Sequence, residues 1–268
     1  MQIKESFFLI KIIRFFIKPW GYDIVPTKNP GLKVEEKITE FFNLALIKCE
    51  HPAYQTSYSQ VAEDIIVSDL FYRKNNSLPS YLELGVESPI YINNTYKFYK
   101  RGSNGVLVEA NPKHIEQIKR IRPNDKLISS AVGVNEAESV NLYYLQNGCE
   151  SISKEEAEFR EKAGNKINEV IQIPCLTINK IIEHNFQDGP PDFLSIDIEG
   201  MDFDVLKTLD FEKYPIPVIC AETLIFGGLR TLQRNIEIIN FLTTKGYFVY
   251  ADTYINTIFV NKDWYFKK

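Results

Sequence analysis

Cysteine and histidine are scarce in this sequence, and their spacing argues against two common ways of stabilising a small fold. The 268 residues include three histidines and four cysteines, and no two cysteines form a CxxC pair: they are Cys49, Cys149, Cys175 and Cys220. Such wide spacing is typical neither of a disulfide framework nor of a structural zinc site, and it indicates free thiols in a reducing compartment. With 44% hydrophobic residues, the chain can instead bury one large apolar core.

The chain also lacks an excess of positive charge. Its 31 lysines and arginines are outnumbered by 35 aspartates and glutamates, which gives a formal net charge of −4. Proteins that bind the phosphate backbone of a duplex normally carry a basic excess. The composition therefore argues against nucleic acid as a partner.

Residues 1–20 are the exception, with a net charge of +3. Their charged residues are Lys4, Glu5, Lys11, Arg14 and Lys18, and phenylalanine and isoleucine fill most other positions. On a helix the four cations would lie on one narrow face. They also interrupt the apolar stretch, whereas a secretory signal or a membrane-spanning helix has an uninterrupted apolar stretch. Two interpretations stay open: an amphipathic helix lying on the cytoplasmic face of a membrane, or a helix packed on its own domain or on a second subunit.

After a connecting region at 21–56, one domain is expected over 57–268, because short apolar runs alternate there with segments of helical spacing. The expected strands are 81–86, 105–110, 126–133, 192–198 and 217–223, with two more at 139–146 and 167–176 around a charged insert, and two at the C-terminus in "YFVYADT" and "TIFVNK". A long helix is expected at 230–245. This order predicts an α/β fold with a doubly wound, mostly parallel sheet, one antiparallel strand near the C-terminus, and ligands at the carboxyl ends of the strands.

Polar residues follow the first two strands. Glu83 and Gly85 end the first, and Glu109 ends the second, where an acid can accept hydrogen bonds from both ribose hydroxyls of a nucleoside cofactor. The first turn lacks the GxGxxG fingerprint and carries Glu87, which would repel a pyrophosphate but tolerate a cation. The pattern therefore favours S-adenosylmethionine over NAD.

Two further carboxylates end the fourth and fifth core strands. Asp197 lies in "FLSIDIEGMD" and Glu222 in "VICAET", and neighbouring strand ends lie close together in a doubly wound sheet. We expect this pair to be catalytic, with Glu199 in support, while Asp202 is placed to cap the following helix. Two roles stay open: one carboxylate acts as a base whose pKa its neighbour raises, or Asp197 and Glu222 together bind a divalent cation such as magnesium.

These motifs resemble the FkbM-type S-adenosylmethionine-dependent methyltransferases over roughly residues 57–262. The resemblance rests on "YSQVAEDII", "YLELGVESPIYINNTYKFYKRGSNGVLVEANP", "SAVG", "LSIDIEGMDFDVLKTLDF" and "VICAET". It implies a class I methyltransferase fold and O-methylation of a hydroxyl on a small molecule, a sugar, a glycan or a glycolipid. The acids at the strand ends also resemble those of catechol O-methyltransferase, which implies that Asp197 and Glu222 could bind a metal ion.

Carried over by position, the resemblance implies a cofactor site made of Glu83, Gly85, Asn94, Thr95, Glu109, Ala131 and Val132. Of these, Ala131 and Val132 would flank the adenine, and Asn94 and Thr95 would lie near the amino-acid end. The expected protein is a cytoplasmic methyltransferase. A non-catalytic binding module that keeps the fold is the alternative, and an NAD-dependent oxidoreductase is less favoured because the glycine fingerprint is missing.

The membrane interpretation of residues 1–20 can be tested by co-sedimentation with anionic liposomes. If the segment docks on lipid, the full chain should pellet more than a chain that begins at Asp23. The electrostatic part of this binding should fade at high salt while the aromatic part persists. Equal pelleting of the two chains would refute the membrane interpretation.

Overall fold

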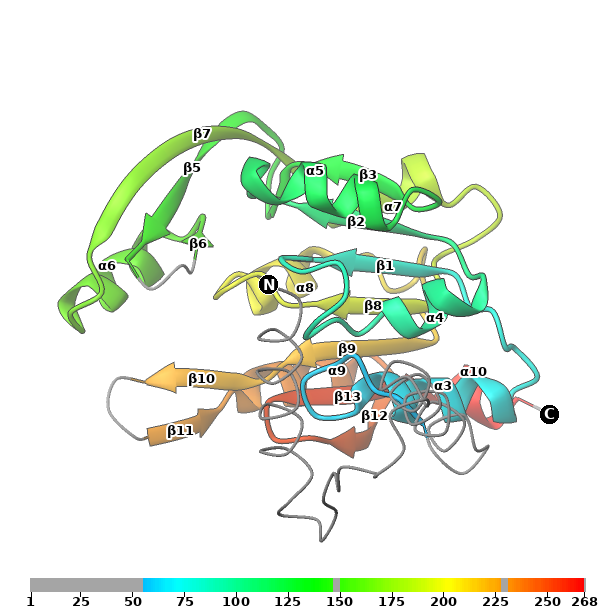
Figure 1. The fold of residues 1–268 in the computed structure, drawn as a ribbon. Helices are drawn as coiled ribbons and strands as arrows, with labels where there is room; N and C mark the ends of the chain where they lie inside the picture. The colour runs from blue at the N-terminus through cyan, green and yellow to red at the C-terminus, as the bar shows by residue number, and fades with distance from the viewer. Residues whose placement is uncertain (1–54, 147–149, 228–230, 268) are drawn as a thin grey trace, which may run out of the picture. The chain divides into compact units, whose positions relative to one another are not determined.

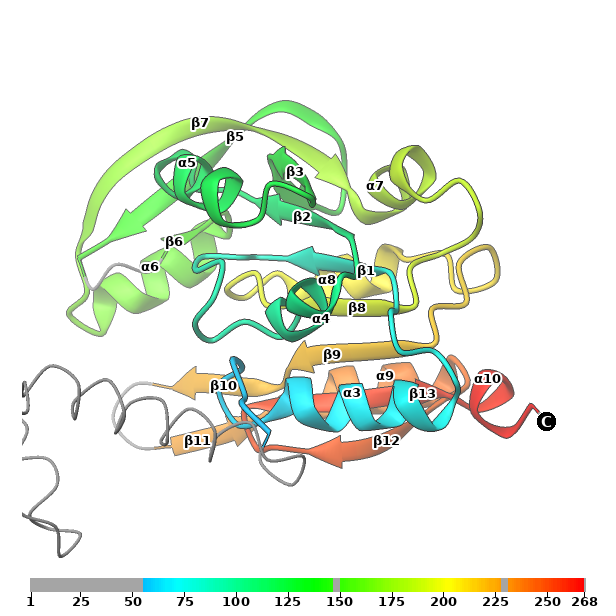
Figure 2. The same ribbon diagram turned by 45° about the vertical axis from the view of Figure 1, so that its right-hand side comes forward.

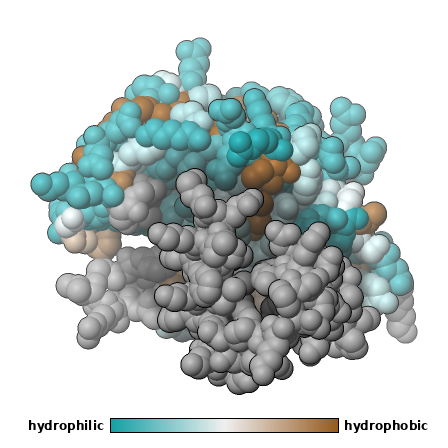
Figure 3. Space-filling view, in the orientation of Figure 1, coloured by the Kyte–Doolittle hydropathy of each residue, from teal (hydrophilic) through white to brown (hydrophobic). Residues whose placement is uncertain are grey.

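The computed structural model describes residues 55–146, 150–227 and 231–267. Thr56–Lys268 form one unit, and the helix predicted at residues 1–20 lies outside the described residues. Among the residues that are described, no helix is both long enough and apolar enough to cross a bilayer. The described surface in Figure 3 is largely hydrophilic, with hydrophobic side chains gathered in small patches.

A seven-stranded sheet organises this unit (Figure 1). Its strands, in spatial order, are β12 (Tyr247–Asp252), β13 (Asn256–Asn261), β9 (Val218–Glu222), β8 (Phe193–Ile196), β1 (Tyr81–Leu84), β2 (Gly105–Glu109) and β3 (Lys126–Ser129). The β13 strand is antiparallel to both of its neighbours, and every other neighbouring pair is parallel. The predicted fold class, with one antiparallel strand near the C-terminus, is confirmed.

Helices cover both faces of the sheet (Figure 2). One core cluster includes apolar residues of α7 (Ile178–Asn185), α8 (Asp202–Thr208) and α9 (Ile236–Thr244). The other includes residues of α3 (Glu63–Arg73), α4 (Tyr96–Arg101) and α5 (Pro112–Ile121), with α10 (Lys262–Phe266) packed against it. Successive side chains of a strand point to opposite faces. Leu82 and Leu84 accordingly pack in the first cluster and Tyr81 in the second, which directs Glu83 toward the α4 and α5 side.

A second sheet and a hairpin extend from the central sheet. The four-stranded sheet has the order β4 (Ala131–Gly133), β7 (Ile167–Thr177), β5 (Ala137–Leu145) and β6 (Glu150–Ser151), with α6 (Lys154–Lys162) between β6 and β7. The hairpin consists of β10 (Leu224–Gly227) and β11 (Thr231–Arg234). Figure 1 shows β10 continuing outward from the carboxyl end of β9, with the far ends of β5 and β7 on the same side of the molecule.

Two predicted elements differ from the structure. The run 126–133 is divided between β3 of the central sheet and β4 of the second sheet. The helix expected at 230–245 begins only at Ile236, because the Asn235 side chain accepts the backbone N–H of Ile238 and caps it there. The four residues before that cap pair with β10 as β11.

Candidate active site

A cavity of about 270 Å³ lies where β1, β2 and β8 end. Six residues predicted to act in binding or catalysis line it: Gly85, Glu109, Ala131, Val132, Asp197 and Glu199. They come from four different strand ends or turns, and the parallel order of β8, β1 and β2 brings three of those ends to one edge. The volume is near the lower end of the range of about 300–1,000 Å³ that small-molecule pockets occupy.

Gly85 lines this cavity, and any side chain on it would collide with the backbone of Asp197. Its φ angle is +82°, and a Cβ atom on it would lie 1.8 Å from the carbonyl oxygen of Asp197. The Gly85 N–H donates to the Val108 carbonyl at 3.0 Å, and the Asp197 N–H donates to the Leu84 carbonyl at 3.0 Å. The turn after β1 is therefore held tightly against the end of β8, and the missing side chain is what allows this close backbone approach.

The Glu109 carboxylate, which also lines the cavity, accepts several backbone hydrogen bonds. One oxygen accepts the backbone N–H groups of Val86 and Glu87, at 3.1 and 2.8 Å, and the other accepts that of Asn111 at 2.7 Å. His114 Nδ1 lies 3.6 Å from the second oxygen, too far for a hydrogen bond but close enough for the carboxylate to raise the pKa of His114. Three of the roughly four acceptor positions of the carboxylate are thus engaged.

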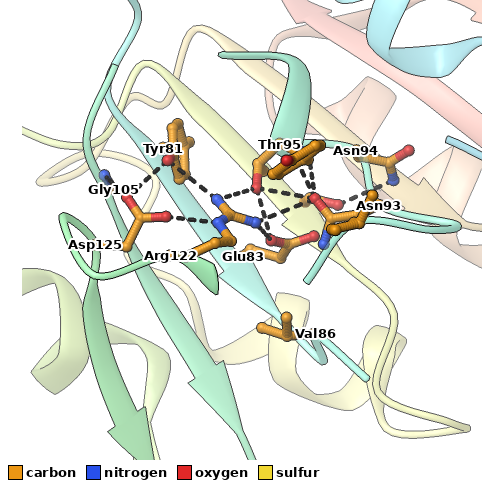
Figure 4. A network of polar contacts seen from close by, with 12 residues as sticks. Tyr81, Glu83, Val86, Asn93, Asn94, Thr95, Gly105, Arg122 and Asp125 are labelled. Atoms are coloured by element: carbon orange, nitrogen blue, oxygen red, sulfur yellow. Dashed lines mark hydrogen bonds and ion pairs between the residues drawn. The ribbon is translucent and has the colours of Figure 1, made fainter. Parts of the chain in front are cut away.

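Glu83 does not line the cavity; it belongs to a buried polar network on the α4 and α5 side of β1 (Figure 4). Its carboxylate accepts the Thr95 hydroxyl at 2.6 Å and Arg122 Nη1 at 3.1 Å. The fully buried Arg122 guanidinium also donates to Asn93, Thr95, Tyr81 and Asp125. Burial raises the pKa of Glu83, and the Arg122 charge opposes that rise.

Asn94 and Thr95 likewise face protein rather than the cavity. The Asn94 amide donates to Ser195 Oγ at 3.1 Å, while Thr95 is bound to Glu83. Their neighbour Asn93 donates to the Ser88 carbonyl at 3.0 Å and so connects the Arg122 network to the turn that lines the cavity. Glu83 and Thr95 thus belong to the network that supports that turn, whereas Asn94 contacts β8, and direct cofactor contact of all three stays a prediction.

Asp197 and Glu222 meet, as the sequence predicts. Their carboxyl groups are hydrogen-bonded to each other, which requires one of them to carry the proton. Burial, together with the negative charges of Asp202 and Glu199, raises the pKa of both groups. At neutral pH the pair therefore keeps a proton.

Glu199 and Asp202 lie in the turn that follows β8. Glu199 adopts a left-handed φ of 52°, and Asp202 accepts the Ile198 N–H at 3.0 Å. The predicted capping role of Asp202 is wrong, because Met201 holds the N-cap position and Asp202 is the first residue of α8; its carboxylate instead bonds the turn that precedes the helix. Burial nevertheless raises the pKa of Asp202 to about 6, because it outweighs the backbone hydrogen bonds.

Arg160 of α6 is a site residue that the sequence analysis missed. Its guanidinium bonds Glu199 at 2.7 Å and Glu156 at 2.6 Å. It also lines a second cavity, of about 110 Å³, with Asp202 and Glu222; the other lining residues are Glu156, Phe159, Gly200, Phe203, Leu224, Asn235 and Ile238. Asp197 lines the first cavity and Glu222 the second, so the hydrogen-bonded pair lies between them.

The residues present do not fit the predicted divalent-cation site. No group of three or more histidine, cysteine, aspartate or glutamate side chains in the described part of the chain is arranged to hold a metal ion. Asp197 and Glu222 offer only two carboxyl groups, whereas magnesium and calcium favour several oxygen ligands.

The fold and the site define the class of protein: a doubly wound sheet with one antiparallel strand, and a nucleoside-sized cavity at its strand ends. The profile of the family described as "Methyltransferase FkbM domain" matches residues 83–249, more than half of the chain. The chain belongs to this family, as its motifs predict, and is an S-adenosylmethionine-dependent methyltransferase.

Solved structures add only distant similarity. An O-methyltransferase from Bacillus cereus in complex with SAH is 12% identical, with a TM-score of 0.39, and the match covers 92% of this chain and 96% of that one. A 1,6-didemethyltoxoflavin-N1-methyltransferase from Burkholderia thailandensis is 9% identical, with a TM-score of 0.36 and coverage of 88% and 92%. A TehB-like SAM-dependent methyltransferase from Corynebacterium glutamicum is 9% identical, with a TM-score of 0.37 and coverage of 85% and 97%. No curated protein matches the sequence.

The Arg122 network yields a stability prediction. Arg122→Leu should lower the free energy of unfolding by about 3–5 kcal/mol, because it leaves the buried carboxylates of Glu83 and Asp125 without their cation. Denaturant unfolding measures this loss. The matched control is Arg120→Leu, since Arg120 is exposed on α5, and its effect should stay within about 0.5 kcal/mol. Equal losses in the two variants would contradict the role given to the network.

Proposed function

We propose that the protein transfers a methyl group from S-adenosylmethionine to a hydroxyl oxygen of a sugar, a glycan or a glycolipid. The observation that carries this proposal is the position of the Asp197–Glu222 pair of carboxyl groups, which lies between two cavities. One cavity is assigned to the methyl donor and the other to the acceptor. An acceptor hydroxyl between them would meet a carboxyl group able to take its proton.

The larger cavity fits the donor. Gly85 presents backbone without a side chain to it, Glu109 presents a carboxylate, and Ala131 and Val132 provide small apolar surfaces suited to an adenine ring. When bound, the cofactor supplies an electrophilic methyl group on a positively charged sulfur. The Glu109 carboxylate keeps an acceptor position for a ribose hydroxyl beside its three backbone N–H bonds.

The carboxyl pair has the chemistry of a general base. When the pair has lost one of its two protons, one oxygen can accept the hydroxyl proton while the remaining carboxyl O–H donates to its neighbour. A base with a raised pKa is better matched to a weakly acidic hydroxyl than an ordinary surface carboxylate. The low-dielectric surroundings that raise the pKa thus also favour proton transfer.

The smaller cavity suits a hydroxyl-rich acceptor. It presents hydrogen-bonding groups of Glu156, Arg160 and Asn235 beside the aromatic rings of Phe159 and Phe203. Apolar rings with a few convergent polar groups are the usual lining of small-molecule sites. Because α6 and the start of β10 contribute to this lining, the insert and the hairpin are expected to determine which acceptor is methylated.

The proposed reaction is tested by incubating the protein with S-adenosylmethionine labelled on its methyl group and a panel of sugars, glycans and glycolipids. The expected product carries the label in a methyl ether. Label that appears only on nitrogen or sulfur acceptors would overturn the assignment to hydroxyls. Cofactor binding without any transfer would favour a non-catalytic binding module.

The catalytic pair yields a prediction in two variants. Asp197→Asn and Glu222→Gln should each abolish turnover while cofactor binding, measured by calorimetry, persists. In the unmodified protein, kcat/KM should rise with pH, because the fully protonated pair has no oxygen free to accept a proton. The midpoint of that rise should lie above the ordinary carboxyl range of about 4, since burial raises both pKa values. Turnover that survives in both variants would contradict the assignment.

Glu109 is predicted to contribute directly to cofactor affinity. Glu109→Ala removes a charge-assisted hydrogen-bond acceptor and should weaken S-adenosylmethionine binding by about 1.5–3 kcal/mol, measured by calorimetry. Glu116→Ala, at an exposed position of α5, is the matched control. Unchanged affinity in a folded Glu109→Ala protein would remove Glu109 from the cofactor site.

A further inference from the structure

We propose that Glu87 makes the larger cavity selective for a positively charged ligand, so that it binds S-adenosylmethionine more tightly than the neutral thioether product, S-adenosylhomocysteine. This inference rests on the proposed function, because it takes that cavity as the cofactor site. Glu87 is then a residue that determines cofactor specificity, and the loss of its attraction after methyl transfer favours release of S-adenosylhomocysteine.

The lining of the cavity has an unusual charge balance. It contains five acidic residues and no lysine, arginine or histidine: the acids are Glu87, Glu109, Glu150, Asp197 and Glu199. Four of them have partners. Glu109 accepts three backbone N–H groups, Glu150 accepts the Asn111 amide, Asp197 shares a proton with Glu222, and Glu199 pairs with Arg160.

Glu87 is the acid without such a partner. Among the described residues, its carboxylate makes no hydrogen bond and no ion pair, while its backbone N–H is fixed by Glu109. The residue also adopts a φ of +47°, a left-handed conformation that glycine, asparagine or aspartate adopt more readily. The chain thus keeps, on the cavity wall, a negative charge that no hydrogen bond or ion pair of the described residues engages, although Glu109, Glu150 and Glu87 together raise the pKa of His114. The chain does so in a turn where glycine would be less strained.

The charge distinguishes the cofactor before and after the reaction. In the transfer the sulfur–methyl bond breaks, an oxygen–methyl bond forms, and the hydroxyl proton passes to the carboxyl pair, so that the sulfonium becomes a neutral thioether. Attraction to Glu87 is lost at that step. Because Glu87 is exposed to solvent, its field is screened, and an effect on the order of fivefold in affinity is expected rather than hundreds of times.

The test is calorimetry on the full chain with three ligands: S-adenosylmethionine, S-adenosylhomocysteine and sinefungin, an analogue with an ammonium group in place of the methylsulfonium. The two cationic ligands should bind more tightly than S-adenosylhomocysteine. In Glu87→Gln, their affinities should fall about fivefold while that of S-adenosylhomocysteine stays unchanged. Glu212→Gln is the control, because it changes the net charge equally at an exposed residue that precedes the amino end of β9. It should alter none of the three affinities.

Glu87→Gly separates charge from backbone strain, because glycine accepts the left-handed conformation. It should lose the same selectivity without a lower thermal midpoint. If the ratio of the two cofactor affinities is equal in the unmodified protein and in both variants, the inference is overturned while the proposed function stands. If the unmodified protein binds none of the three ligands, the cofactor assignment fails as well.

Discussion

The candidate site depends on the close approach of two backbone segments, the turn after β1 and the end of β8. Gly85 makes this approach possible, since any side chain there would collide with the Asp197 carbonyl. The same contact places Asp197 on the cavity wall, and the parallel pairing of β8 with β9 brings Glu222 to it. A single glycine thus allows the backbone contact that positions Asp197 of the catalytic pair.

Buried charge is handled in two different ways on the two sides of β1. Toward α4 and α5, Glu83 and Asp125 are matched to the Arg122 guanidinium, which gives rigidity but no reactive group. Around the cavities, Asp197 and Glu222 face each other with Arg160 bound to Glu199 rather than to them. The first arrangement stabilises the turn that lines the site, and the second keeps a proton ready for exchange at the strand ends.

The sequence predicts the parts of this structure that repeat a local pattern. Apolar runs located the strand ends, and Gly85, Glu109, Asp197 and Glu222 follow from them because parallel strands end at one edge. The sequence does not predict that Glu83 points away from the cavity. The alternation of side chains along β1 shows that neighbouring residues lie on opposite faces of the sheet, but it does not show which face borders the cavity. The roles of Arg122 and Arg160 are not predictable from local patterns. Arg122 bonds Glu83 and Arg160 bonds Glu199, and each pair is 39 residues apart in the sequence. The sequence predicts a helix over β11, but the pairing of β11 with β10 makes these residues a strand.

The central claim is that Asp197 and Glu222 share a proton at neutral pH between the two cavities. Infrared difference spectroscopy in the carbonyl region measures this directly, because a protonated carboxyl group absorbs apart from a carboxylate. A protonated-carboxyl band is expected at neutral pH, and both Asp197→Asn and Glu222→Gln should change it, because each variant removes one of the two carboxyl groups. A spectrum in which both carboxyl groups are fully ionised at neutral pH, with no band that either variant alters, would contradict this claim.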